Sequence, residues 1–319
     1  MRNVLLTGAT GFLGAAITKR LMNDANHRLV LALRRAASQL PADTKSVLVG
    51  DLSVKTDWSS ALSGIDVVIH TAARVHVMND KAGDPLEEFR KVNFEGTMAL
   101  ARQAVQAGVK RFVFISSIKV NGEETLPGKP FTAADLPKPV DPYGISKAET
   151  EQALLALSAQ AGIEVVIIRP VLVYGPGVKA NFNSMMKWLS RGVPLPLGCV
   201  HNRRSLVTLD NLVDLIVTCI EHSAAVDQIF LVSDDEDLST TELLQRVSKA
   251  LGVRARLLPV PAILIKAAAR LLGKRAVSQR LLGSLQVDIS KTRELLGWTP
   301  PVSVDAALEK TAQSFLRQK

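Results

Sequence analysis

The sequence predicts an α/β fold, with a doubly wound parallel sheet in the first half and a smaller C-terminal lobe. Short apolar, β-branched runs alternate with helical or polar segments between residues 3 and 168, which is typical of a parallel sheet. After Arg169-Pro170, prolines and glycines become frequent and strand patterns few. We therefore predict a sheet domain over residues 1–170, with a return strand near 205–235, and a mainly substrate-binding lobe over 171–319.

Six runs are expected to form strands, at residues 3–7, 28–33, 46–49, 66–70, 111–115 and 164–168. Two segments between them, residues 86–107 and 146–161, have helical periodicity. They end at Gly108 and Gly162, and glycine is the residue type that most often ends a helix.

A glycine turn follows the first predicted strand, with Gly8, Gly11 and Gly14 leading into apolar residues at helical spacing from Leu13 to Leu21. Glycine lets the backbone approach a pyrophosphate, and the start of the helix directs free N–H groups at it. Strand, turn and helix in this order predict a dinucleotide-binding site.

Tyr143 and Lys147 are one helical turn apart further along the chain. A phenol has a pKa of about 10 and is a slow acid or base near neutrality unless a nearby positive charge favours its ionised form. Lys147 can supply that charge. Asp141 and Pro142 are expected to be the N-cap and first residue of the helix, which places Tyr143 where the helix dipole also favours an anion.

Composition excludes several classes of protein. The chain is 47% hydrophobic and 22% charged, as in ordinary globular proteins, and no apolar run approaches the roughly 20 residues of a membrane span. Its net charge of +9 favours anionic ligands, but with 4% aromatic residues and no basic and aromatic alternation we expect no nucleic-acid partner. Cys199 and Cys219 are too few for a disulfide framework and lack metal-binding spacing, which favours the cytoplasm and no metal site.

A basic stretch runs from Lys266 to Arg280. We expect an amphipathic helix there that covers a pocket or is solvated on one face, in preference to a membrane anchor.

Several motifs in order resemble the extended short-chain dehydrogenase/reductase family over almost the whole chain. They are Thr7-Gly8-Ala9-Thr10-Gly11-Phe12-Leu13-Gly14, Gly50-Asp51-Leu52, His70-Thr71-Ala72-Ala73, Asn93-Phe94-Glu95-Gly96-Thr97, Ser116-Ser117, the segment from Tyr143 to Lys147, and Arg169-Pro170. The resemblance implies a Rossmann-type sheet, and a homodimer formed through the helices near Leu100 and Tyr143.

The resemblance also implies a nicotinamide dinucleotide site in which Asp51 and Leu52 border the adenine, Ala72 and Ala73 pass the cofactor backbone, and Lys147 binds the ribose. The further residues expected at this site are Gly8, Thr10, Gly11, Phe12, Leu13, Gly14, Arg34, Arg35, Arg74, Asn93, Ser116, Tyr143, Pro170 and Val173.

For catalysis the resemblance implies Ser117, Tyr143 and Lys147. Ser117 would hydrogen-bond the reacting oxygen, with Ser116 as the alternative for that role. We interpret His70 as a strand-end residue rather than a catalyst, because the tyrosine and lysine already fill the acid–base role.

Two further segments, 173–177 and 204–207, resemble the branch of the family that acts on nucleotide-linked sugars. In that branch the arginine that matches Arg204 holds the substrate diphosphate, which suits the planar fork of guanidinium donors; the alternative is a surface arginine beside Arg203. Asn181 is expected at the same UDP-type ligand. A second arginine that epimerases often have is absent from residues 283–288.

The reaction remains open between two alternatives. The second strand ends in Arg34-Arg35 instead of an acid, which suits the 2′-phosphate of NADP(H) and makes NAD(H) the second choice. An NADPH-dependent reductase acting on a UDP-4-keto-6-deoxy sugar is therefore preferred. The whole chain resembles bacterial proteins that make such sugars for surface polysaccharide (O-antigen) synthesis. The alternatives are a UDP-glucose or UDP-N-acetylglucosamine 4-epimerase with bound NAD and a non-catalytic dinucleotide sensor.

Overall fold

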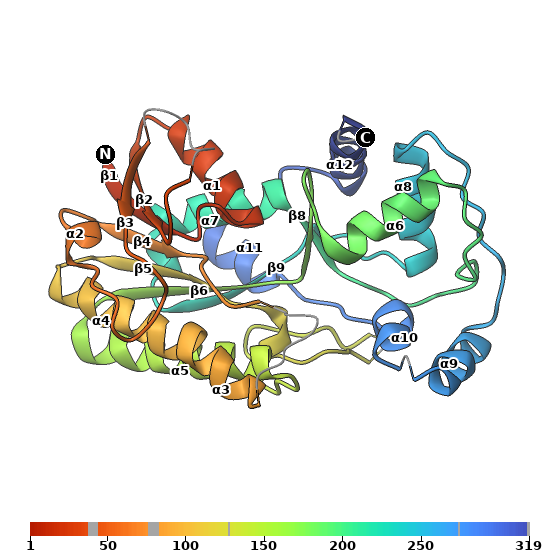
Figure 1. Ribbon diagram of the computed structural model, residues 1–319, viewed down its shortest axis with the longest axis horizontal. Helices are drawn as coiled ribbons and strands as arrows, with labels where there is room; N and C mark the ends of the chain where they lie inside the picture. The colour runs from red at the N-terminus through yellow and green to blue at the C-terminus, as the bar shows by residue number, and fades with distance from the viewer. Residues whose placement is uncertain (38–43, 76–82, 127, 274, 318–319) are drawn as a thin grey trace.

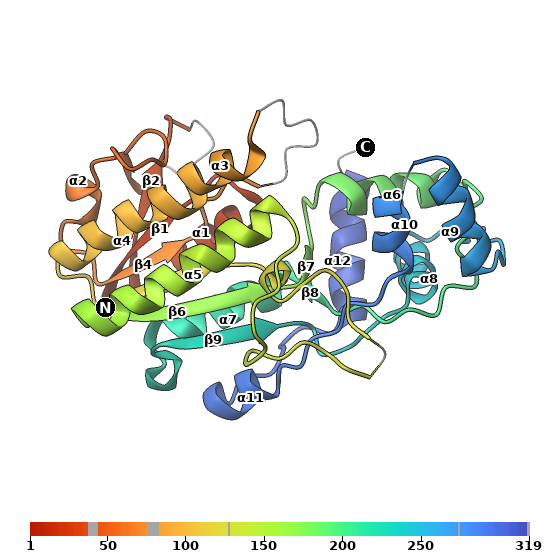
Figure 2. The same cartoon turned by 90° about the horizontal axis from the view of Figure 1, so that it is seen from below.

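A seven-stranded parallel sheet forms one end of the molecule, and a smaller lobe forms the other (Figures 1 and 2). The computed structural model describes residues 1–37, 44–75, 83–126, 128–273 and 275–317. The strand order is β3-β2-β1-β4-β5-β6-β9. The order reverses between β1 and β4, and ligands of such sheets bind at the carboxyl ends of the strands beside this reversal.

The six predicted strands are confirmed, with ends shifted by no more than two residues, and the predicted return strand is β9. The strands of the sheet are β1 (Arg2–Thr7), β2 (His27–Leu33), β3 (Lys45–Leu48), β4 (Val67–His70), β5 (Arg111–Ile115), β6 (Glu164–Pro170) and β9 (Gln228–Val232). Most of their side chains are buried, because helices cover both faces.

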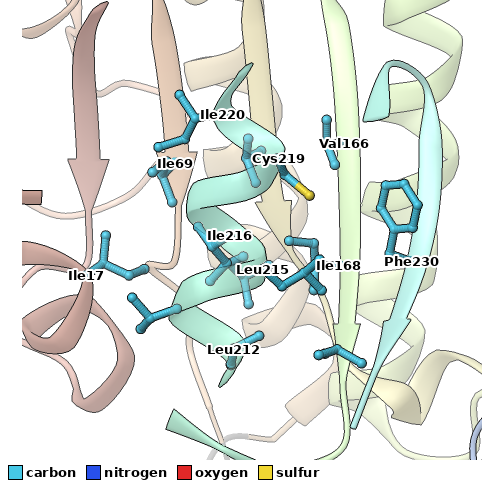
Figure 3. Close-up of a cluster of buried hydrophobic side chains, with 14 of the residues drawn as sticks. Ile17, Ile69, Val166, Ile168, Leu212, Leu215, Ile216, Cys219, Ile220 and Phe230 are labelled. Carbon is cyan, nitrogen blue, oxygen red and sulfur yellow. The ribbon is translucent and has the colours of Figure 1, made fainter. Parts of the chain in front are cut away.

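One face of the sheet is covered by α1 (Phe12–Met22), α7 (Leu209–Glu221) and α11 (Ser290–Leu296). Figure 3 shows α7 laying Leu212, Leu215, Ile216 and Cys219 against the central strands. The opposite face is covered by α2 (Ser59–Leu62), α4 (Thr97–Gln106) and α5 (Pro142–Ala161).

The helix expected at residues 86–107 is continuous but not uniform. It begins as α3 (Pro85–Phe89), passes through the π-helical segment η1 (Arg90–Gly96) and continues as α4. The wider π turn was not predicted, because the spacing of the apolar residues does not distinguish it from an α-helical turn. Such turns occur frequently at functional sites.

Helix α5 begins as the sequence predicts. Asp141 is its N-cap and accepts a hydrogen bond from the backbone N–H of Gly144, Pro142 is the first helical residue, and the helix ends at Gly162 with φ 71°. Tyr143 and Lys147 therefore lie on its first two turns.

The second lobe has its own hydrophobic cluster, in which α6 (Ala180–Ser190), α8 (Thr240–Ala250) and α12 (Val304–Arg317) pack together. A pair of parallel strands, β7 (Leu172–Tyr174) and β8 (Leu206–Thr208), joins the two lobes. The remaining elements are η2 (Ile118–Val120), η3 (Ser223–Ala225), α9 (Ala262–Leu271) and α10 (Arg275–Leu282). Elements α7, β9 and α11 follow residue 170 in the chain but belong to the sheet or pack on it. The packing of the two lobes therefore does not change at residue 170. The predicted domain boundary there stays a prediction.

A buried ion pair fastens α5 to the sheet. The Arg169 guanidinium on β6 donates to both carboxylate oxygens of Glu151, at 2.5–3.1 Å, and to Asn121 Oδ1 at 2.9 Å. Both charged side chains are almost completely buried. Removing one partner from such a pair leaves the other charge without compensation in a medium of low polarity.

Replacing Glu151 by Gln is expected to lower the free energy of unfolding by about 3–5 kcal/mol, because the Arg169 charge stays buried. The matched control is Glu149→Gln on the same helix, which breaks a half-exposed pair with Arg90 and should cost about 1 kcal/mol or less. Urea denaturation measures both. Equal losses in the two variants would contradict the assignment.

Candidate active site

The glycine turn between β1 and α1 has no room for side chains. Gly8 has φ 74°, and a Cβ there would lie 2.6 Å from Thr71 Oγ1. A Cβ on Gly14 would lie 2.1 Å from the Gly8 carbonyl oxygen. The turn therefore depends on glycine at both positions, as the sequence pattern indicates.

The N-terminus of α1 is ready to receive an anion. Its N-cap is Gly11, which provides no side-chain cap, and no acidic residue lies in its first turn. Free N–H groups and the positive end of the helix dipole remain for a pyrophosphate. Thr10, Phe12 and Leu13 surround this helix start, and the residues present fit a dinucleotide.

Asn93 lies in the π turn of η1 and hydrogen-bonds to the segment 72–74, which follows β4. Its side-chain amide accepts from the Arg74 N–H at 2.8 Å and donates to the Arg74 carbonyl at 3.1 Å and to Ser146 Oγ at 3.1 Å. The backbone N–H of Ala72 donates to Thr7 Oγ1 at 3.2 Å. The predicted cofactor segment 72–74 is thereby fixed beside the glycine turn.

At the adenine end, Arg34 and Arg35 are exposed. Arg34 Nε lies 3.7 Å from a carboxylate oxygen of Asp51, and both side chains are mostly exposed. Leu52 is half-buried and packs on Gly96 of η1. The predicted basic pair thus has an acid beside it, and that acid disfavours a second negative charge such as a 2′-phosphate.

Tyr143 lies at the start of α5, with Ser117 at the end of β5. Burial and the charge of Asp141 raise the pKa of Tyr143, and a hydrogen bond with Ser117 opposes this shift. The ring packs edge-on against Phe89, with 6.0 Å between centroids. Ser117 Oγ also accepts from the Lys119 N–H at 3.3 Å, which holds the hydroxyl at the strand end.

Lys147 is buried beneath Tyr143. Its ammonium group donates to the Ile115 carbonyl at 2.8 Å and lies 4.3 Å from the centre of the Phe114 ring and 6.0 Å from that of Tyr143. Burial lowers the pKa of Lys147 to about 7, against the opposing charge of Glu151. The structure thus brings the three predicted catalytic residues together.

Ser116, the alternative to Ser117, has a buried hydroxyl with no hydrogen-bond partner within the described part of the chain. Such a group is costly unless a ligand or water satisfies it. This fits its predicted place at the cofactor. Pro170 ends β6 and is buried, and Val173, the middle residue of β7, is half-buried.

His70 is completely buried and makes two hydrogen bonds, to Thr7 Oγ1 at 2.8 Å and Thr97 Oγ1 at 2.9 Å. Burial and the charge of Lys147 lower the pKa of His70 to about 3, so the ring is neutral at physiological pH. This agrees with a strand-end residue that positions neighbours.

The two predicted substrate residues lie in the second lobe. Arg204 pairs with Leu238 and Leu285 through its backbone and donates from its guanidinium to the Gly283 carbonyl at 3.0 Å. Burial lowers the pKa of Arg204, and the charge of Glu124 opposes that shift. Asn181 is exposed on the first turn of α6. Their substrate roles stay predictions.

Two charged contacts were missed by the sequence analysis. Lys119 forms an ion pair with the α5 cap residue Asp141, and Glu151 pairs with Arg169. The second could have been suspected, since Glu151 lies one turn after Lys147 on the buried face of α5. No cluster of three or more metal-binding side chains occurs in the described ranges.

A parallel sheet with a glycine turn at the reversal point and a serine, tyrosine and lysine at the strand ends defines an enzyme of the short-chain dehydrogenase/reductase class. A model of the NAD dependent epimerase/dehydratase family matches residues 4–233. A Vibrio cholerae protein named UDP-glucose 4-epimerase is 50% identical over 317 residues, which cover 99% of this chain and 96% of that protein. The chain belongs to the NAD dependent epimerase/dehydratase family.

Solved structures share the fold over the whole chain. The UDP-glucuronic acid 4-epimerase of Bacillus cereus, in complex with NAD, has a TM-score of 0.80 at 22% identity and covers 99% of each chain. The UDP-glucose 4-epimerase of Thermotoga maritima, with UDP-glucose, has a TM-score of 0.78 at 21% identity, also with 99% of each chain covered.

The buried ammonium predicts a pH effect on stability. Because the pKa of Lys147 is lowered from 10.5 to about 7, the unfolded chain binds more protons than the folded one between these values. The free energy of unfolding of the cofactor-free protein should therefore rise with pH from 7 to 9.5, relative to a Lys147→Met variant, by up to about 1.4 kcal/mol per pH unit. Urea denaturation at several pH values measures this difference. Parallel curves for the two proteins would show that Lys147 is not desolvated.

Proposed function

We propose that this protein is a nucleotide-sugar 4-epimerase that works with tightly bound NAD, with UDP-glucose as the first substrate to test. The observation that carries the proposal is the complete set of Ser117, Tyr143 and Lys147 in a chain that is 50% identical to a protein named UDP-glucose 4-epimerase. The reductase preferred on sequence grounds is not supported by these relatives, and neither is the preference for NADP.

The preference for NADP rested on the arginine pair at the end of β2. A pair of arginines indicates a 2′-phosphate only if no acid competes for them, and the sequence does not show which side chain stands opposite. In the structure Asp51 faces Arg34 at 3.7 Å. This arrangement supports NAD, whose ribose carries hydroxyls in place of the phosphate.

When bound, the nicotinamide would supply the acceptor and donor of hydride for C4 of the sugar. Tyr143 would take the proton of the C4 hydroxyl and later return it. Ser117 would hold the same oxygen by a hydrogen bond. Arg204 would hold the diphosphate while the 4-keto sugar turns to present its opposite face.

Lys147 would tune this proton transfer. Without ligands, burial and Asp141 keep Tyr143 protonated, and the pKa of Lys147 is near 7. The diphosphates of cofactor and substrate bring negative charge, which favours the charged lysine. A charged Lys147 in turn lowers the pKa of the phenol above it.

Tyr143→Phe is expected to lower turnover by roughly 10²–10⁴-fold, because the proton acceptor is lost, while the amount of bound NAD stays unchanged. Tyr174→Phe is the matched control, since it changes the only other tyrosine of the chain, which lies buried in the second lobe. Its turnover should stay within a few-fold of the unchanged protein. Normal turnover in Tyr143→Phe would remove the proposed acid–base role.

The choice of reaction is tested by the cofactor content of the purified protein and its action on UDP-glucose. We expect near-stoichiometric NAD after heat release, and conversion of UDP-glucose to UDP-galactose without added NADPH or NADH. Mass analysis and NMR of the sugars measure the two quantities. A cofactor-free protein that consumes NADPH with a UDP-4-keto-6-deoxy sugar would replace the epimerase by the reductase.

A further inference from the structure

The net charge of the chain is concentrated in one segment of the second lobe. Residues 243–287 contain no aspartate or glutamate. The basic residues there are Arg246, Lys249, Arg254, Arg256, Lys266, Arg270, Lys274, Arg275 and Arg280. The rest of the chain has equal numbers of acidic and basic residues, so the whole formal charge of +9 belongs to this segment. Lys274 lies outside the described residues.

Helix α9 in this segment has its apolar side turned outward. Ile263 is 75% exposed, Leu264 57% and Leu271 89%. Their spacing places them on one side of the helix, and the half-buried Ile265 packs against the lobe on another. One helix that covers a pocket or is solvated on one face was expected from Lys266 to Arg280. The structure has two helices there, α9 and α10, and the face of α9 that is open to solvent carries large apolar side chains, which is costly in water.

Basic side chains flank this apolar side. Lys266 and Arg270 are exposed on the next turns of α9, at helical angles adjacent to Ile263. A hollow of about 850 Å³ lies beside the segment that leads into α9, and three arginines line it, Arg191, Arg254 and Arg256. In Figures 1 and 2, α9 lies at the end of the second lobe farthest from the sheet.

We propose that the face formed by α9 and the basic residues 254, 256, 266 and 270 docks on the surface of an anionic phospholipid membrane. An apolar helix side bordered by lysine and arginine enters the boundary between head groups and acyl chains, and the basic groups pair with lipid phosphates. The contact is peripheral. Within the described residues no helix is long and apolar enough to cross a bilayer.

The basic charge of the α9 face favours an anionic membrane over a second copy of this chain as its partner. A two-fold contact through α9 would bring the same basic residues against each other. No acidic side chain of this segment could compensate them, and Arg246 already pairs with Glu236 and Asp305. An anionic lipid surface complements both the apolar and the basic parts of the face.

The docking face is connected to the proposed substrate site. Helix α10 packs against α9, and the carbonyl of Gly283, the residue that follows α10, accepts hydrogen bonds from Asn202 and Arg204. Docking would hold the enzyme next to a membrane while the sheet domain faces away. This inference does not depend on the choice between epimerase and reductase.

Sedimentation with phospholipid vesicles tests the proposal on the full chain. We expect the protein to pellet with vesicles of phosphatidylcholine and phosphatidylglycerol at low salt, and to stay in solution with pure phosphatidylcholine or in high salt. Lys266→Ala/Arg270→Ala should weaken binding roughly 30-fold, because each basic residue contributes about fivefold at such a surface. Leu264→Glu/Leu271→Glu should abolish it.

The matched control is Lys19→Ala/Lys55→Ala, which removes the same charge from exposed positions of the sheet domain and should bind as the unchanged protein does. Loss of binding in this control equal to that in Lys266→Ala/Arg270→Ala would overturn the proposal in favour of unspecific attraction. Failure of the unchanged protein to bind the vesicles would also overturn the proposal. If Leu264→Glu/Leu271→Glu then changed the oligomeric mass, α9 would be a contact between copies. Turnover of soluble substrate should be unchanged in all variants, so the docking face and the reaction are tested separately.

Discussion

The buried ammonium group of Lys147 is the constraint on which the catalytic end of the molecule depends. It is held by the Ile115 carbonyl and lies over the Phe114 ring, so β5 and α5 have to meet at this point. A buried charge needs compensation, and Glu151 on the next turn provides part of it while Arg169 holds Glu151 in place. The helix that carries Tyr143 is therefore fixed by charges at two successive turns, which gives the Tyr143 hydroxyl a defined position.

The strands of the sheet and the starts of α1 and α5 were predictable because each has a local cause in the sequence. Buried parallel strands need continuous apolar runs, and the glycine turn needs residues without a Cβ at Gly8 and Gly14. Asp141 and Pro142 predicted the start of α5 because capping is decided within four residues. The π turn at Asn93 was not predictable, since it depends on contacts with Arg74 and Ser146 from other segments.

Features that depend on which distant side chain lies opposite a residue could not be predicted from the sequence. The Arg34-Arg35 pair indicated a phosphate, but its meaning changes when Asp51 stands opposite Arg34. The basic stretch from Lys266 to Arg280 predicted one amphipathic helix, but the structure divides it between α9 and α10 with a turn at Leu272 and Gly273, and the pattern did not show the direction of the apolar side of α9. Sequence periodicity shows that a helix has two sides; only packing shows which one is turned to the protein.

We infer that Lys147 controls the ionisation of Tyr143. The chain has two tyrosines, and the pKa of Tyr174 is raised far above its usual value by burial and by Asp234, so tyrosinate absorbance in a pH titration reports Tyr143 alone. We expect a midpoint above 10 in the cofactor-free protein, a midpoint shifted toward neutrality in the NAD-loaded protein, and no such shift in Lys147→Met. An NAD-induced shift of equal size in Lys147→Met would contradict it.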